Sequence, residues 1–330
     1  MRKEVVFAII AGLGLGLVIA FGAWRANQVL SPTDTNKAES SPTPKPEFGI
    51  TLAAPPPFSV LTDTPTSLTG VTKANTFVVV SGEEDDYLTV ADSKGSFEQS
   101  IDLIGGTNFL VVAAFDEKGS EVSQKVLLLF STEFEKYLVD ATETQNATDS
   151  VRERVQQKVS QALNSPTALL GTVTDISENT LQIKTEEGEI EQLSVSSDTS
   201  VVQTGTKNKD VKLGDVAIGD YIIAMGFRNG NGVHNTKRIL ITSPVEATAR
   251  KVVYGRVVKN NTKDVLAQFV RNEEDLKVVP AKNATIQVLS EGKFSTIKFT
   301  SLIPDDVFLA IGEDAKDAFS ARTIFVVKRP

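Results

Sequence analysis

The first apolar stretch of the chain, Val5 to Trp24, contains no charged residue. At about 1.5 Å per residue, a helix of this length spans roughly 30 Å, the thickness of a hydrocarbon core. A helix that is apolar on every face suits lipid and not water, so we predict a transmembrane helix over residues 5–24, with the lipid bilayer as its partner. Gly12 and Gly16 form a GxxxG pair within it, although glycine is common in spanning helices in any case.

Flanking charges orient this predicted helix. Arg2 and Lys3 precede it and a single Arg25 follows it, and an excess of positive charge marks the cytoplasmic side. We therefore expect residues 1–4 in the cytoplasm and the rest of the chain on the far side of the cell membrane. The alternative is a signal peptide that is cleaved after Gly22, which would give a secreted protein.

Residues 25–47 have a different composition. Between Ser31 and Glu47 no apolar residue is larger than alanine, and the segment contains four prolines. Such a segment cannot bury enough apolar surface to offset the entropy lost on ordering, and proline favours an extended chain. We predict a stalk that holds the following modules away from the membrane.

From residue 48 to 131 the pattern changes to short apolar runs separated by turn residues. The runs are FGITL, SLTGV, TFVVV, YLTV, SFEQSIDL, NFLVVAAF and VLLLF. Each has the length of a strand and is rich in Val, Thr or Phe, and glycines lie between several of them. Strands at this spacing predict a β-sandwich.

This region also resembles a known family. Its motif pieces are Leu68-Thr69-Gly70, Ala74-Asn75-Thr76, Asp92-Ser93-Lys94-Gly95-Ser96-Phe97, Gly106-Thr107-Asn108 and Ala114-Phe115-Asp116-Glu117-Lys118-Gly119. Their order is similar to that of the bacterial immunoglobulin-like modules of surface proteins. The resemblance implies a spacer or adhesive module and carries over no catalytic residue.

Residues 132–167 read as a connector with one helix at about 151–164. Ser150 and Glu153 fit a capping box at the start of that helix. Apolar residues then recur every four positions from Val151 to Leu163, a spacing that drifts around the helix and so does not form a coiled-coil seam. We expect the apolar stripe to pack on the following module, with self-association as the alternative.

The last half of the chain contains an internal repeat with an offset of about 85 residues. Leu170-Gly171-Thr172-Val173 corresponds to Tyr254-Gly255-Arg256-Val257, and the segment from Gly219 to Gly226 corresponds to that from Asp305 to Gly312. This period is too long for a solenoid and suits two copies of one small domain, at residues 168–244 and 250–330. Five or six short strands in about 80 residues close most economically into a small OB-like barrel.

Both copies resemble a family of exported bacterial domains of unknown function. In the first copy the resemblance is carried by Gly171-Thr172-Val173, Val211-Lys212-Leu213-Gly214-Asp215 and Ile218-Gly219-Asp220-Tyr221-Ile222. The second copy departs from this motif, since Pro304-Asp305 stands where Ile218-Gly219 stood, so its turn geometry does not follow from the family pattern. The resemblance implies no activity. The expected fold class is mainly β: a transmembrane helix, an immunoglobulin-like sandwich, a linker helix and two tandem barrels.

Charge and composition exclude several classes of function. The 330 residues include no cysteine, so the chain has neither disulfides nor thiolate sites, and the formal net charge of -8 disfavours a nucleic-acid partner. The first copy does contain three neighbouring lysines, Lys207, Lys209 and Lys212. Its only aromatic residues are Tyr221 and Phe227, which are too few for a platform on which bases stack.

The run Glu83-Glu84-Asp85-Asp86 is the one candidate metal site, for calcium. The alternating ligand spacing of a dedicated calcium loop is absent, so a solvated loop is the favoured interpretation. His234 is the single histidine and follows an Asn-Gly-rich turn. We expect it to be a solvated loop residue, since no serine or aspartate motif accompanies it.

Two pairs of carboxylates are candidates for acid–base chemistry: Asp215 with Asp220, and Asp305 with Asp306. Because aspartate is also a common turn former, a structural role is favoured for both pairs. The sequence therefore predicts no catalytic residue and no cofactor.

Together these patterns predict a single-pass membrane protein that is not an enzyme. Its expected role is display, adhesion or scaffolding in the cell envelope, with an envelope protein or polysaccharide as partner. Binding of an envelope polysaccharide is the first alternative, and a carboxylate-dependent hydrolase is the second.

Overall fold

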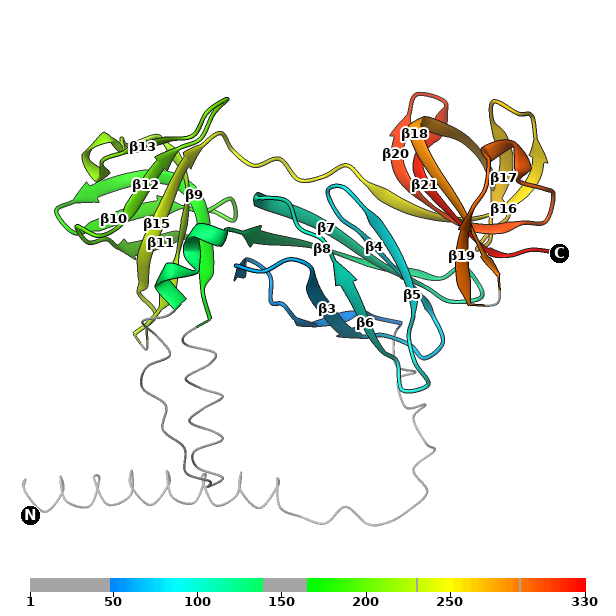
Figure 1. Ribbon diagram of the computed structural model, residues 1–330, viewed down its shortest axis with the longest axis horizontal. Coiled ribbons are helices and arrows are strands. Elements are labelled where there is room, and N and C mark those ends of the chain that lie inside the picture. Colours follow the sequence, from blue (N-terminus) through cyan, green and yellow to red (C-terminus); the bar gives the residue numbers. More distant parts are fainter. Residues whose placement is uncertain (1–47, 139–164, 230, 291) are drawn as a thin grey trace, which may run out of the picture. The chain divides into compact units, whose positions relative to one another are not determined.

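The computed structural model describes residues 48–138, 165–229, 231–290 and 292–330, and these residues are mainly β, in several sheets (Figure 1). The predicted transmembrane helix with Val5, Gly12, Gly16 and Trp24, the predicted stalk at 25–47 and the predicted helix at 151–164 lie outside them. Within the described ranges, no helix has the length and hydrophobicity to cross a membrane.

The first part of the described chain forms two antiparallel sheets, apart from a short parallel edge strand. The smaller has the order β1-β3-β6 and the larger the order β2-β8-β7-β4-β5. Their strands are β1 (Thr51–Ala54), β2 (Val60–Leu61), β3 (Thr66–Val71), β4 (Phe77–Ser81), β5 (Asp86–Val90), β6 (Ser96–Ile101), β7 (Gly106–Phe115) and β8 (Glu121–Phe130). Leu68 and Phe97 of the smaller sheet share one core with Val80, Val112 and Leu128 of the larger. The two sheets therefore pack face to face, and each predicted apolar run overlaps a strand.

The larger sheet is buried on both faces. Along β4, Val78 and Val80 point into the core between the sheets, whereas Val79 belongs to a separate cluster on the other face. Val111 and Ala113 of β7 join Val79 in that second cluster. A strand that is covered on both sides reads as a continuous apolar run instead of an alternating one, which explains the sequences FVVVS and NFLVVAAF.

Two further sheets follow, and each closes on itself. In the first, the order β11-β10-β9-β14-β15 is closed by a parallel pairing of β11 with β15, and β12 and β13 extend it. Its strands are β9 (Thr167–Ser177), β10 (Thr180–Lys184), β11 (Ile190–Ser194), β12 (Ser200–Gln203), β13 (Lys209–Val211), β14 (Tyr221–Arg228) and β15 (His234–Thr242). We call this the first closed sheet.

The second closed sheet repeats the pattern. The order β17-β16-β20-β21-β18 is closed by pairing of β17 with β18, and β19 extends it. Its strands are β16 (Lys251–Asn260), β17 (Val265–Phe269), β18 (Asp275–Ser290), β19 (Lys293–Thr296), β20 (Val307–Ala315) and β21 (Ala318–Lys328). The long β18 takes the place of both β11 and β12, since its two ends each pair with β21 in parallel.

The turn before β20 keeps its geometry although its sequence departs from the first copy. Gly219 has φ +98° and donates its N–H to the Val173 carbonyl at 2.9 Å. Asp305 has φ +68° and makes the equivalent hydrogen bond to Val257, also at 2.9 Å. Aspartate tolerates this left-handed conformation better than most residues, so it can replace the glycine.

A glycine lets each closed sheet bend sharply. Gly226 of β14 and Gly312 of β20 both lie where the pairing with the next strand shifts register. A Cβ atom at Gly226 would lie 2.0 Å from the Asn235 carbonyl oxygen, and one at Gly312 would lie 1.9 Å from that of Ser320. Only glycine allows so close an approach at this bend.

Both closed sheets pack on the outer face of the larger sheet through equivalent strands. In β14, Ile223 and Met225 turn away from the interior and contact Leu127 and Leu129 of β8. In β20, Leu309 belongs to the cluster that includes Val79, Val111 and Ala113. Residues Phe48–Pro330 consequently form one compact unit.

We expect Leu309→Ala to lower the free energy of unfolding by about 2–5 kcal/mol, because it leaves a cavity at this shared cluster. Leu309 is fully buried, whereas Leu266 of β17 is 42% exposed and provides a matched control. Urea titrations of the wild type, Leu309→Ala and Leu266→Ala would measure the difference. Equal losses for the two variants would contradict this packing.

Candidate functional site

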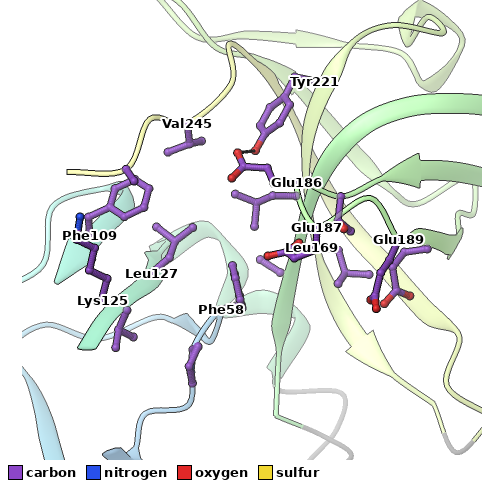
Figure 2. A pocket seen from close by; sticks show the side chains of 17 residues that line it. Phe58, Phe109, Lys125, Leu127, Leu169, Glu186, Glu187, Glu189, Tyr221 and Val245 are labelled. Atoms are coloured by element: carbon purple, nitrogen blue, oxygen red, sulfur yellow. Dashed lines mark hydrogen bonds between the residues drawn. The ribbon is translucent and has the colours of Figure 1, made fainter. Parts of the chain in front are cut away.

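A cavity of about 360 Å³ lies between the first closed sheet and the larger sheet (Figure 2). Its apolar lining comes from both sides: Phe58, Phe109 and Leu127 lie on one wall, and Leu169 and Tyr221 lie on the other. The connection between the two closed sheets adds Val245. The size is that of an ordinary small-ligand pocket.

Phe58 is held in the wall of this cavity by backbone hydrogen bonds to strands β8 and β9. Its N–H donates to the Leu127 carbonyl at 2.7 Å, and its carbonyl accepts from the Ala168 N–H at 2.8 Å. Its φ of +63° is unusual for a bulky residue, and the residue is still 41% exposed. The surrounding hydrogen bonds thus hold the Phe58 backbone in an unfavourable conformation, and its ring lies at the cavity.

Acidic residues surround the opening on the side of the first closed sheet. Glu186, Glu187 and Glu189 lie on the turn between β10 and β11, and their side chains are exposed (Figure 2). The Tyr221 hydroxyl donates to Glu186 Oε1 at 3.3 Å, and burial, reinforced by that carboxylate, raises the pKa of Tyr221 to about 12. Within the described ranges, none of these three glutamates forms an ion pair.

Two other charged residues of the lining, Glu191 and Lys125, have partners within the protein. Glu191 pairs with Arg228 at 3.2 Å. Lys125 donates from Nζ to the Thr248 carbonyl at 2.8 Å. The cavity therefore combines an apolar interior with a net negative rim.

The acidic run in the β4–β5 turn anchors the second closed sheet. Arg250 donates to Glu83 from Nη1 at 2.9 Å and from Nη2 at 3.2 Å. Arg322 donates to Asp86 from Nε at 2.9 Å and from Nη2 at 2.6 Å. Burial acts to raise the pKa of Glu83, but the hydrogen bonds from Arg250 and from the Phe109 N–H outweigh it and hold that pKa below its ordinary value.

The interpretation of this run as a solvated loop is therefore wrong for two of its residues. The Asp86 side chain is only 1% exposed, while Glu84 and Asp85 face solvent. Among the described residues, no group of three or more His, Cys, Asp or Glu side chains is placed to hold a metal ion.

His234 is fully buried, so the prediction of a solvated loop histidine is wrong. It begins β15 instead of lying in the preceding turn, and its Nε2–H donates to the Thr167 carbonyl at 3.1 Å. The Thr236 hydroxyl lies 3.1 Å from Nδ1 and donates to it in the neutral ring. Burial lowers the pKa of His234 and favours that neutral form.

The candidate acid–base aspartates serve their own turns. Asp215 accepts from the Lys212 N–H at 2.8 Å, and Asp220 accepts from the Ala217 N–H at 2.9 Å. Asp306 is fully buried and pairs with Arg329 at 2.8 Å, while Asp305 occupies the left-handed turn position. Asp215, Asp220 and Asp306 thus make hydrogen bonds within their own turns, whereas Asp305 contributes its backbone conformation.

The structure does not gather the candidate nucleic-acid residues on one surface. Lys207, Lys209 and Lys212 are exposed on and beside β13. Tyr221 and Phe227 instead belong to the apolar cluster that joins the first closed sheet to the larger sheet.

Sequence reasoning missed the residues that join the sheets. The sequence around Arg250 and Arg322 does not predict their roles, since their partners lie more than 160 residues away along the chain. Phe134 lies within the predicted connector, yet it is fully buried and its ring centroid lies 5.7 Å from that of Phe227. The three rim glutamates lie around Gly188, but only the fold places them at a cavity.

Comparisons with known proteins give no family. The chain matches no family model and no curated protein. Among solved structures it is similar to a Drosophila Unr structure ("CSD456") with 8% identity, a TM-score of 0.17 and coverage of 78% of this chain and 99% of that one. A multidomain Streptococcus pneumoniae protein with nucleic-acid-binding domains has 10% identity, a TM-score of 0.15 and coverage of 82% and 76%.

A third similar structure is a Ca²⁺-stabilised adhesin with which an Antarctic bacterium binds ice. It has 14% identity, a TM-score of 0.18 and coverage of 86% of this chain and 74% of the adhesin. These are weak matches to β-rich multidomain proteins and carry no argument about this chain.

We expect Arg250→Ala to cost about 3–5 kcal/mol of stability, because it leaves the Glu83 carboxylate unpaired in a partly buried site. Lys251 is the matched control, since it pairs with Asp314 in solvent, where both side chains are more than 60% exposed. Lys251→Ala is expected to cost less than about 1 kcal/mol. Urea denaturation at pH 7 would measure both, and a loss for Arg250→Ala as small as the control's would refute the anchoring role.

Acidification should destabilise the protein through His234. Because its folded pKa lies below the ordinary value of 6.5, the unfolded chain binds the proton first. The stability that the neutral ring contributes is present above pH 6.5 and is lost as the pH falls, at no more than about 1.4 kcal/mol per pH unit. Denaturation between pH 7.5 and 5.5 should show a shallower pH dependence for His234→Gln than for the wild type. Identical slopes would show that the ring titrates normally.

Proposed function

We propose that this chain is a non-catalytic scaffold of the cell envelope that presents its β modules to partners as one stiff body. One observation carries the proposal: the outer face of the β2-β8-β7-β4-β5 sheet is apolar, and both closed sheets cover it. Modules that are joined only by linkers move independently by default, unless the interface between them is large and hydrophobic. Here Phe115 and Tyr254 pack with ring centroids 5.7 Å apart, deep in such an interface.

We further propose that the first two sheets form an immunoglobulin-like sandwich and that the closed sheets are OB-like barrels. Support comes from the face-to-face packing of the first pair around one core and from the five-strand closure in each copy. Such modules recur in proteins that bridge or display, and a fold alone assigns no reaction.

The proposed location rests on the sequence. The uncharged run at residues 5–24 would hold the chain in the cell membrane with residues 1–4 in the cytoplasm, and the stalk at 25–47 would separate the β modules from the lipid. The proposed partner is an envelope protein or polysaccharide. We propose no nucleic-acid partner, in keeping with the net charge of -8.

Fractionation of a bacterial host that expresses the full chain tests the proposal. We expect the intact chain in the membrane pellet after alkaline washing, and we expect protease added to spheroplasts to degrade the β modules. The double variant Leu13→Arg/Leu17→Arg should release the chain, because each arginine costs about 2.5–3.5 kcal/mol at the centre of a spanning helix. A wild-type chain that is soluble in the cytoplasm, or β modules that are protected in spheroplasts, would exclude the envelope scaffold.

A further inference from the structure

We propose that the cavity between the first closed sheet and the larger sheet binds a basic, apolar peptide segment of a partner protein. The inference goes beyond the scaffold function, since it assigns a ligand site, and it holds or fails wherever the chain is located. It combines three observations: an apolar cavity, an exposed aromatic ring held in its wall, and carboxylates at its opening that have no cation.

The apolar part of the cavity suits a single large side chain. About 360 Å³ is available, and Phe58, Phe109, Leu127 and Tyr221 are among the residues that line it. Phe58 is 41% exposed although hydrogen bonds on both sides fix its backbone. Because the backbone is fixed before binding, only side-chain freedom is lost when a ligand packs against the ring.

The charge of the rim selects the ligand. Glu186, Glu187 and Glu189 form no ion pair within the described parts of the chain, and the one cation of the lining, Lys125, is bonded to Thr248. A free acid or phosphate would be repelled. A lysine or arginine beside the inserted side chain would gain charge-assisted hydrogen bonds to these carboxylates.

An extended peptide places these groups at the right separation. Successive residues along a strand rise about 3.3 Å and point to opposite sides, so one apolar side chain can enter the cavity, and the long flexible side chains of adjacent lysines can bend back to the carboxylates of the rim.

Fluorescence anisotropy with labelled peptides tests the site on the full chain in zwitterionic detergent. We expect GKFKG to bind, GSFSG to bind several-fold more weakly, and GEFEG to show no binding. Raising the salt concentration from 50 to about 500 mM should weaken binding of GKFKG, because exposed charge pairs are screened.

Variants show whether the cavity is responsible. Glu187→Gln/Glu189→Gln should weaken binding of GKFKG by about threefold to thirtyfold, as expected for two exposed charge pairs. Glu178→Gln/Asp210→Asn is the matched control, since it removes the same charge from residues that do not line the cavity, and its affinity should be unchanged. Phe58→Ala should weaken binding of both GKFKG and GSFSG.

Three results with the peptides would each overturn the proposal. They are equal affinities for the three peptides, equal losses in the rim variant and its control, and no binding of GKFKG at millimolar concentration. Hexylammonium that bound as tightly as GKFKG would also overturn it, because the cavity would then take a free organic cation and not a peptide.

Discussion

The apolar outer face of the β2-β8-β7-β4-β5 sheet is the constraint on which the rest of the structure depends. A sheet with both faces apolar cannot leave one of them in water, so β4, β7 and β8 require covering modules as much as they require their own core. The two closed sheets meet this requirement with equivalent strands: β14 covers Leu127 and Leu129, and β20 covers Val79 and Val111. Two closed sheets with corresponding strand orders thus supply two covers for a single sheet.

Polar contacts then determine the position of the second closed sheet on the larger sheet. Apolar packing is not directional. The paired hydrogen bonds from Arg250 to Glu83 and from Arg322 to Asp86 are directional, and they fix where the second closed sheet lies relative to the end of β4. Part of the outer face, beside Phe58, is covered by neither closed sheet. This uncovered part lines the cavity, and the acidic β10–β11 turn borders it. The cavity is in this sense a consequence of covering one sheet with two separate modules.

Local patterns in the sequence predicted the strands, the internal repeat and the mainly β fold. Alternation, turn residues and the recurring Gly226 and Gly312 are visible without a structure, because they report on the chain within a few residues of each position. The partners of Arg322 and Glu83 were not predictable, since side chains more than 160 residues apart meet only in the folded chain. His234 is a second example. The sequence indicates the turn before it, but its burial depends on contact with Thr167, the first residue of β9, which is distant in the sequence. The uninterrupted apolar run of β7 did contain a signal of two-sided burial.

Calorimetry of the full chain tests the shared packing most directly. If the first two sheets and both closed sheets depend on common apolar clusters, they should unfold together, in one transition whose calorimetric enthalpy is close to its van't Hoff enthalpy. Two or three separate transitions, with a calorimetric enthalpy that is a multiple of the van't Hoff value, would contradict the account, because modules that unfold one at a time do not need one another to cover the outer face of the larger sheet.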